Sequence, residues 1–116
     1  MSRLEARPPE AGPAPVFAAL GDRTRLALLE TLSDGRARSI AALSSDSDLT
    51  RQAVTKHLDV LERAGLVRGL RVGRENRFAY QPASIVRARS YLEAVSAQWD
   101  DALIRLKAFV EQPDGG

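Results

Sequence analysis

The segment from Thr50 to Gly65 constrains the fold more than any other part of the chain, because it carries the start signal, the stop signal and the two-sided pattern of a helix. Threonine is a preferred N-cap residue, and glycine is preferred just past a helix end. On a helical wheel the apolar and polar residues separate into two arcs, which predicts a helix packed on one side. The apolar arc holds Ala53, Val54, Leu58, Val60, Leu61 and Ala64, and the polar arc begins with Arg51, Gln52, Thr55 and Lys56.

A shorter helix is predicted just before this one. Ser39 can cap a helix that contains Ile40 and Leu43, and a polar run at 44–48 separates that helix from Thr50. Two short helices joined by a tight polar turn form a helix-turn-helix. His57, the one histidine, falls beside the apolar arc of the wheel. We therefore expect a packed, hydrogen-bonded histidine rather than one that binds a metal or a base.

After Gly65 the apolar period changes from that of a helix to that of a strand. Val67, Leu70 and Val72 precede the turn-like residues 73–76, and apolar residues alternate again up to Tyr80. This pattern predicts a β-hairpin.

The flanking segments read as further helices. Two are predicted before the helix-turn-helix, interrupted at Gly21, with Asp22 as the cap of the second. A last helix of about 28 residues should start at Pro82 and Ser84 and run to Glu111, on the order of 42 Å. We expect a mainly α fold with a small β-hairpin, in one domain over 15–111. A disordered arm at 1–14 and a flexible tail at 112–116 flank it.

Composition excludes several classes of protein. The 116 residues include no cysteine, which rules out disulfides, thiolate metal sites and cysteine nucleophiles. No serine, threonine or lysine falls in a nucleophile motif, and no glycine-rich phosphate loop occurs, so we expect no enzyme activity. No apolar stretch approaches the roughly 20 residues that cross a bilayer, and the N-terminal residues lack the apolar centre of a secretion signal. We expect a cytoplasmic protein without membrane contact.

Positive charge is concentrated in the middle of the chain. Residues 50–80 carry 7 basic and 3 acidic side chains, whereas the whole chain has a net charge of +2. A basic patch on a balanced domain indicates a polyanionic partner, and double-stranded DNA suits the side chains present. A charged helix face or strand edge can also be no more than a solvated surface. The DNA hypothesis assigns base contacts to Arg51, Gln52, Thr55 and Lys56, and phosphate contacts to Thr50, Arg71, Arg74 and Arg77.

The last predicted helix carries an apolar stripe along its whole length. Some of this stripe must pack within the chain, but so small a body cannot cover both of its ends. We therefore predict a partner helix from a second copy. The stripe contains Leu92, Val95, Trp99, Leu103, Leu106 and Val110.

Four stretches together resemble the ArsR-type bacterial winged-helix repressors. They are residues 17–26, residues 40–43, residues 53–67, and the hairpin with Gly73-Arg74 and Phe78-Ala79-Tyr80. The third, with Thr-Lys-His-Leu followed by Leu-Glu-Arg-Ala-Gly-Leu-Val, is the most specific. The resemblance covers roughly residues 15–110. It implies a winged helix-turn-helix homodimer that places each recognition helix in a major groove of a palindromic operator, with Val16 and Phe17 joining the stripe in the dimer interface.

The chain departs from the metal-sensing members of that family. Residues 40–44 hold no cysteine, and the last helix offers Glu93, Asp100, Asp101 and Glu111 without a histidine. Transition-metal sensing would lack its usual ligands, so we expect no metal or other cofactor. The chain resembles the metal-free branch, in which Trp99-Asp100 is a familiar feature. We expect a sequence-specific DNA-binding repressor, with a winged-helix module for protein–protein contact as the alternative; no residue identifies a small-molecule effector.

Overall fold

The computed structural model describes residues 12–112. The chain is mainly helical with a small antiparallel sheet, as predicted. The expected N-terminal arm and C-terminal tail lie almost entirely outside the described residues. The elements in order are α1 (Ala14–Leu20), α2 (Arg23–Leu32), β1 (Arg38–Ser39), α3 (Ile40–Ser45), α4 (Arg51–Arg63), β2 (Val67–Val72), β3 (Glu75–Tyr80) and α5 (Ala83–Glu111).

Three helices begin at the polar caps that the sequence predicts. The Asp22 carboxylate accepts hydrogen bonds from the backbone N–H groups of Thr24 and Arg25, at 2.9 and 3.0 Å. Ser39 and Thr50 accept in the same way from residues three positions on, at 3.1 and 3.0 Å. The N–H of Arg25 is the largest influence that lowers the pKa of Asp22. These caps satisfy backbone donors that a helix start leaves unpaired.

The apolar arc of α4 lies at the centre of the core. Val54, Leu58 and Leu61 are fully buried, together with Leu32 from α2 and Leu66 beyond α4. Val60, predicted for the same arc, is 36% exposed. That part of the prediction is wrong because Val60 falls at the edge of the arc, where the polar face begins.

The predicted hairpin is part of a three-stranded sheet in the order β1-β3-β2. Val72 pairs with Glu75, so the turn comprises Gly73 and Arg74 and is shorter than the expected turn at 73–76. Strand β1 pairs with β3 through Arg38 opposite Phe78. The sequence did not predict β1, because a strand of two residues has no periodicity to detect.

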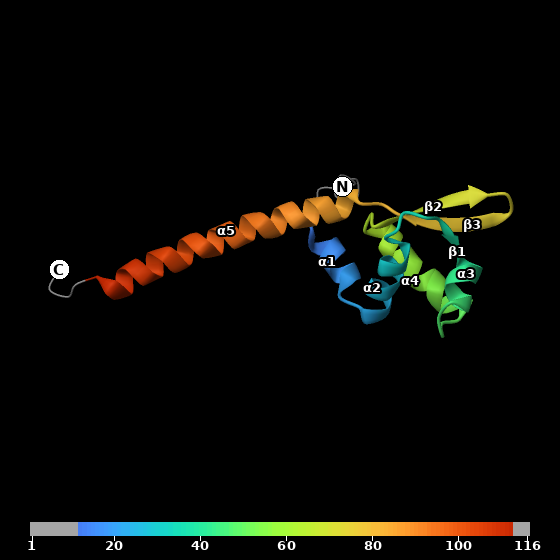
Figure 1. The fold of residues 1–116 in the computed structure, drawn as a ribbon, viewed down its shortest axis with the longest axis horizontal. Coiled ribbons are helices and arrows are strands. Elements are labelled where there is room, and N and C mark those ends of the chain that lie inside the picture. The colour runs from blue at the N-terminus through green and yellow to red at the C-terminus, as the bar shows by residue number, and fades with distance from the viewer. Residues whose placement is uncertain (1–11, 113–116) are drawn as a thin grey trace, which may run out of the picture.

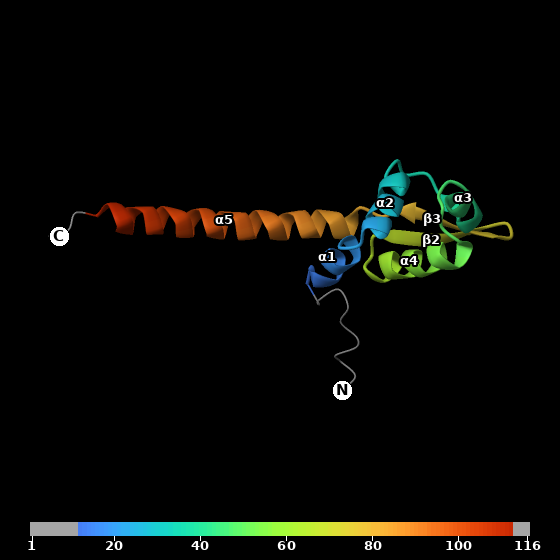
Figure 2. The same cartoon turned by 90° about the horizontal axis from the view of Figure 1, so that it is seen from below.

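Helix α5 leaves the body on the side opposite the hairpin tip (Figures 1 and 2). Its 29 residues make the molecule elongated, with principal dimensions of 76 × 39 × 21 Å. Near its start it contacts α1, where the Phe17 and Tyr91 ring centroids lie 6.1 Å apart. Within residues 12–112, no helix combines the length and hydropathy that a membrane span requires.

A tight joint connects the end of α4 with the start of α5. Gly65 has a φ of +77°, and the N–H groups of Gly65 and Leu66 donate to Glu62 and Leu61 at 2.9 Å each. This bonding is a Schellman motif, which closes a helix through a left-handed residue. A Cβ at Gly65 would also lie 2.5 Å from Oγ of Ser84, a side chain that is 2% exposed. Glycine is therefore required at residue 65 for two separate reasons.

Substitutions separate these two requirements. Gly35 also has a positive φ but open space around it, so Gly35→Ala should cost about 1–2 kcal/mol of unfolding free energy for conformation alone. Gly65→Ala should lower the free energy of unfolding by more, because the new Cβ also meets Oγ of Ser84. Adding Ser84→Ala removes that oxygen, so the double variant should lose only about as much as Gly35→Ala. Urea unfolding of the variants, with Ser84→Ala alone as a control, measures this. A double variant no more stable than Gly65→Ala would contradict the contact with Ser84.

Candidate nucleic-acid interface

The first turns of α4 present a free polar face. Arg51, Gln52, Thr55 and Lys56 are all exposed, because the buried residues of α4 lie on the other side of the helix. Within residues 12–112, neither Arg51 nor Lys56 takes part in an ion pair. The structure therefore brings the four predicted base-contacting residues together on one accessible surface.

The hydroxyl of Thr55 is partly committed within the helix. It donates to the carbonyl oxygen of Arg51 at 2.8 Å. Thr55 therefore offers a partner its methyl group and a remaining acceptor site, a combination suited to apolar contact with a thymine methyl. Arg51, Gln52 and Lys56 supply the donors of this face.

The turn before α4 is held by serine hydroxyls. Ser44 donates to the Leu49 carbonyl at 2.7 Å, and Ser47 donates to that of Leu43 at 2.9 Å while accepting from Leu49 N–H at 3.2 Å. Side chains that bond to nearby backbone favour turns in this way. The polar run that the sequence identified as a spacer thus fixes how α3 leads into α4.

The hairpin divides the predicted phosphate contacts between its two faces. Arg71 pairs with Asn76 across the strands, two residues from the Gly69–Phe78 pair, so it shares the face on which Phe78 packs against the core. Arg74 is exposed at the tip. Figures 1 and 2 show this tip at the same end of the molecule as α3 and the start of α4, away from α5.

Arg77 lies on the opposite face of the hairpin, paired with Leu70. Its guanidinium forms an ion pair with Glu75, with 2.8 Å between Nη2 and Oε1. Both side chains are exposed, and ion pairs of this kind are weak, so the phosphate contact of Arg77 stays a prediction. Asn76, predicted only as a turn residue, is exposed beside Arg71 and is a further candidate for this contact. The place of Asn76 beside Arg71 is known only from the strand register.

Of the other predicted residues near this surface, Thr50 is exposed and its hydroxyl caps α4. His57 is half-buried, and its ring makes no hydrogen bond with the part of the chain that the structure describes, contrary to the expected hydrogen-bonded histidine.

Arg38 is not available to a partner in the same way as Arg51 and Lys56. Its Nη2 lies 2.8 Å from Oδ2 of Asp34, and this hydrogen bond lowers the pKa of Asp34 well below its usual value. In residues 12–112 no three His, Asp or Glu side chains gather as a metal site would require.

The hairpin is attached directly to α4. The N–H of Gly69, on the outer edge of β2, donates to Oε2 of Glu62 at 3.3 Å. A Cβ at Gly69 would lie 3.4 Å from the Phe78 ring, so the glycine lets that ring cover the strand. The position of the hairpin therefore depends on the same helix that carries the polar face.

The apolar stripe of α5 forms a second exposed surface. Leu92, Trp99, Leu103 and Leu106 are each more than half exposed, Val95 is half-buried, and Phe17 packs beside Tyr91. Val16 is only 6% exposed, so little of its side chain is available for the predicted interface contact. Phe109, which the prediction omitted, extends the surface, whereas the exposed Ile104 lies on the opposite side of the helix. Monomeric proteins rarely expose so continuous an apolar area.

Comparisons with known proteins agree with this geometry. A family model described as a helix-turn-helix domain matches residues 20–69. The HTH-type transcriptional regulator YuzN of Bacillus subtilis is 43% identical over 65 residues, which are 51% of this chain and 71% of YuzN.

Solved structures share the whole architecture. An ArsR-like transcriptional regulator from Rhodococcus sp. RHA1 superposes with a TM-score of 0.79 at 37% identity, over 90% of this chain and 97% of that one. A homodimeric winged helix-turn-helix DNA-binding domain from Mycobacterium bovis has a TM-score of 0.59 at 24% identity, over 73% of this chain and 78% of that one. The second likeness shows the fold alone.

The attachment of the hairpin to α4 can be tested by hydrogen exchange. Glu62→Ala removes the acceptor of the Gly69 N–H, so exchange of that amide should accelerate about fivefold, as loss of ~1 kcal/mol implies. Glu62→Gln keeps an acceptor and should accelerate it less. Unchanged exchange at Gly69 in Glu62→Ala would show that this bond does not hold the hairpin.

Proposed function

The chain belongs to the ArsR-type winged helix-turn-helix transcriptional regulators, and we propose that it binds a palindromic operator as a homodimer and represses transcription by covering promoter DNA. Regulators of this kind bind DNA and are not enzymes. The operator symmetry, the repression and independence from metal ions are our proposals.

The free polar face of α4 is the observation that carries this proposal. Arginine or lysine can pair with guanine and glutamine with adenine in the major groove, which admits an α-helix. Arg51, Gln52 and Lys56 combine these side-chain types on the first turns of α4, the second helix of the helix-turn-helix. Base contacts from that helix, with Arg71 and Arg74 on phosphates, match the way such motifs dock.

The stripe on α5 supports a second copy as the partner. Leu92, Trp99 and Leu106 recur every seven residues, and Val95 and Phe109 fall on the interleaved positions. This is the spacing by which two helices pack along a shared seam. A two-fold dimer uses the same surface on both copies, and the domain from Mycobacterium bovis with this fold is described as homodimeric. Two recognition helices would then meet half-sites about 10 base pairs apart, or a multiple of that distance.

Metal independence follows from the available side chains. The chain has no cysteine, and its one histidine is His57 of α4, so α5 offers only carboxylates. Zinc and related ions prefer thiolate and imidazole ligands. We therefore propose that DNA binding is unaffected by transition metals or chelators.

The two parts of the DNA surface should respond differently to substitution. Gln52→Ala and Lys56→Ala should each reduce discrimination between operator and unrelated duplex, by about 1–3 kcal/mol for a bidentate contact. Arg74→Ala should weaken binding to both duplexes and reduce the log–log salt slope by about 1. Arg77→Ala should weaken binding to both duplexes as well, but less, because the exposed ion pair with Glu75 competes with phosphate. Gel retardation at several salt concentrations measures all four; equal effects of Lys56→Ala and Arg74→Ala would contradict this division.

The dimer depends on the stripe. Trp99 is 64% exposed in the protomer, so Trp99→Asp should place a charge at the centre of the seam and yield monomers in sedimentation. Ala97→Asp adds the same charge on the opposite side of α5 and should leave the dimer intact. An unchanged dimer in Trp99→Asp would remove the stripe from the interface.

A further inference from the structure

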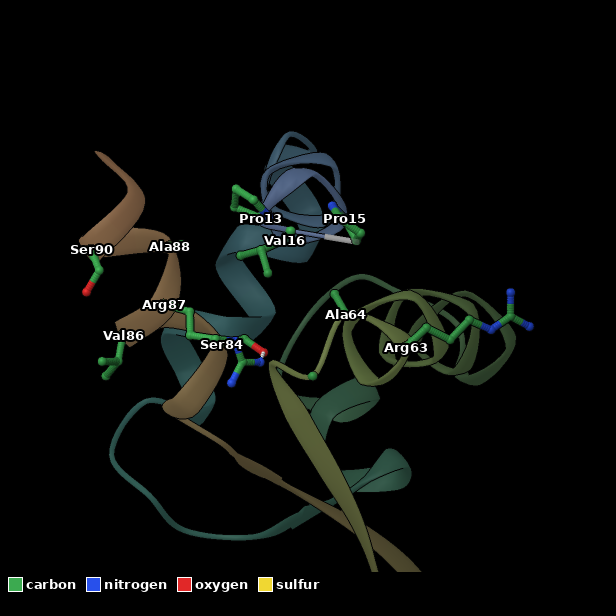
Figure 3. Close-up of a pocket in the computed structure, with 12 residues that line it drawn as sticks. Pro13, Pro15, Val16, Arg63, Ala64, Ser84, Val86, Arg87, Ala88 and Ser90 are labelled. Atoms are coloured by element: carbon green, nitrogen blue, oxygen red, sulfur yellow. Dashed lines mark hydrogen bonds between the residues drawn. The ribbon is translucent and has the colours of Figure 1, made fainter. Parts of the chain in front are cut away.

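A pocket lies where α1, the end of α4 and the start of α5 meet. Its volume is about 570 Å³, within the range of small-molecule sites. Figure 3 shows the three walls, which are formed by the start of α1, the end of α4 and the start of α5. The labelled residues are Pro13, Pro15 and Val16 on the first wall, Arg63 and Ala64 on the second, and Ser84, Val86, Arg87, Ala88 and Ser90 on the third. Most of this lining is apolar. The pocket is separate from the polar face of α4 and from the distal half of the stripe.

The charged groups of the pocket are all positive. Arg63 and Arg87 line it, and no acidic side chain is among the lining residues. Arg63 points away from the enclosed space in Figure 3 and pairs with Asp59 at 3.0 Å. Arg87 forms no ion pair within residues 12–112, and its Nη2 donates to Oγ of Ser84 at 3.1 Å. Arg87 is an exposed side chain, and it supplies a cation that no acidic side chain within residues 12–112 pairs with.

Ser84 adds a second polar group with unused capacity. It is 2% exposed and is the buried polar residue of the described chain. Its oxygen accepts from Arg87, but its own proton has no acceptor among residues 12–112. The Ser84 hydroxyl thus has one partner and keeps its donor free, and a ligand that brings an acceptor can use this donor together with the Arg87 guanidinium.

We infer that this pocket binds a small organic anion, a carboxylate with an aromatic or aliphatic body. The carboxylate would accept hydrogen bonds from Arg87 and Ser84, a charge-assisted pairing that is stronger than a neutral one. The apolar body would lie against Val16, Pro15 and Ala64. Such a ligand would touch the residues at which α4 ends, but its binding does not rest on the proposed function.

Titration of the full chain with 2-naphthoate, followed by the amide resonances, tests the site without DNA. Shifts should concentrate at Ala64, Gly65, Ser84 and Ala88. The neutral 2-naphthamide has a similar shape and should bind at least about tenfold more weakly, since it loses the charge-assisted bond. Shifts along residues 99–110 instead, or equal affinity for the two compounds, would overturn the inference.

Two arginines on one helix provide a matched pair of variants. Arg87→Gln should weaken naphthoate binding about tenfold, whereas Arg89→Gln, outside the pocket lining, should leave it unchanged. Equal losses would show only general charge attraction and would contradict the site. Absence of binding to the wild-type protein would also contradict it. If binding then appeared in Trp99→Asp, the pocket would be an interface covered by the second copy.

Discussion

Burial of one side of α4 is the constraint on which the rest of the structure depends. Val54, Leu58 and Leu61 are all at 0% exposure. Replacing one buried leucine with alanine typically lowers the free energy of unfolding by ~2–5 kcal/mol. Because residues three and four apart share a helix face, burying these three fixes the outward direction of Arg51, Gln52, Thr55 and Lys56. The surface proposed to meet DNA is thus positioned by the core rather than by contacts of its own.

Features set by neighbours in the sequence were predictable. The caps at Asp22, Ser39 and Thr50 and the glycine stop at Gly65 are local interactions, and the structure confirms each of them. The amphipathic pattern of α4 and the hairpin followed from periodicity in the same way.

Features set by distant pairing were not predictable. Strand β1 exists only because Arg38 meets Phe78. The face of Arg77, its pairing with Glu75 and the burial of Val16 likewise depend on register and packing that no local pattern encodes. The buried Ser84 escaped notice because a serine near a helix start reads as a cap, whereas here it lies beneath Gly65.

The joint at Gly65 and Ser84 links the separate parts of the molecule. Helix α4 ends there, Leu66 and Val67 lead from it into the hairpin and are buried, and α5 starts from the same place. Through α5 the joint connects to the stripe proposed to hold the second copy. In the proposed dimer, the geometry of this joint would set how the two α4 helices lie relative to each other and to the hairpin beside each of them.

Footprinting of the wild-type protein on the DNA upstream of its own gene tests the central claim most directly. Two outward-facing α4 helices held by one dimer should protect two major-groove patches on the same side of the duplex, with centres about 10 base pairs apart or a multiple of that spacing. A single protected patch would contradict the dimeric arrangement. Protection confined to the minor groove would contradict the role given to α4.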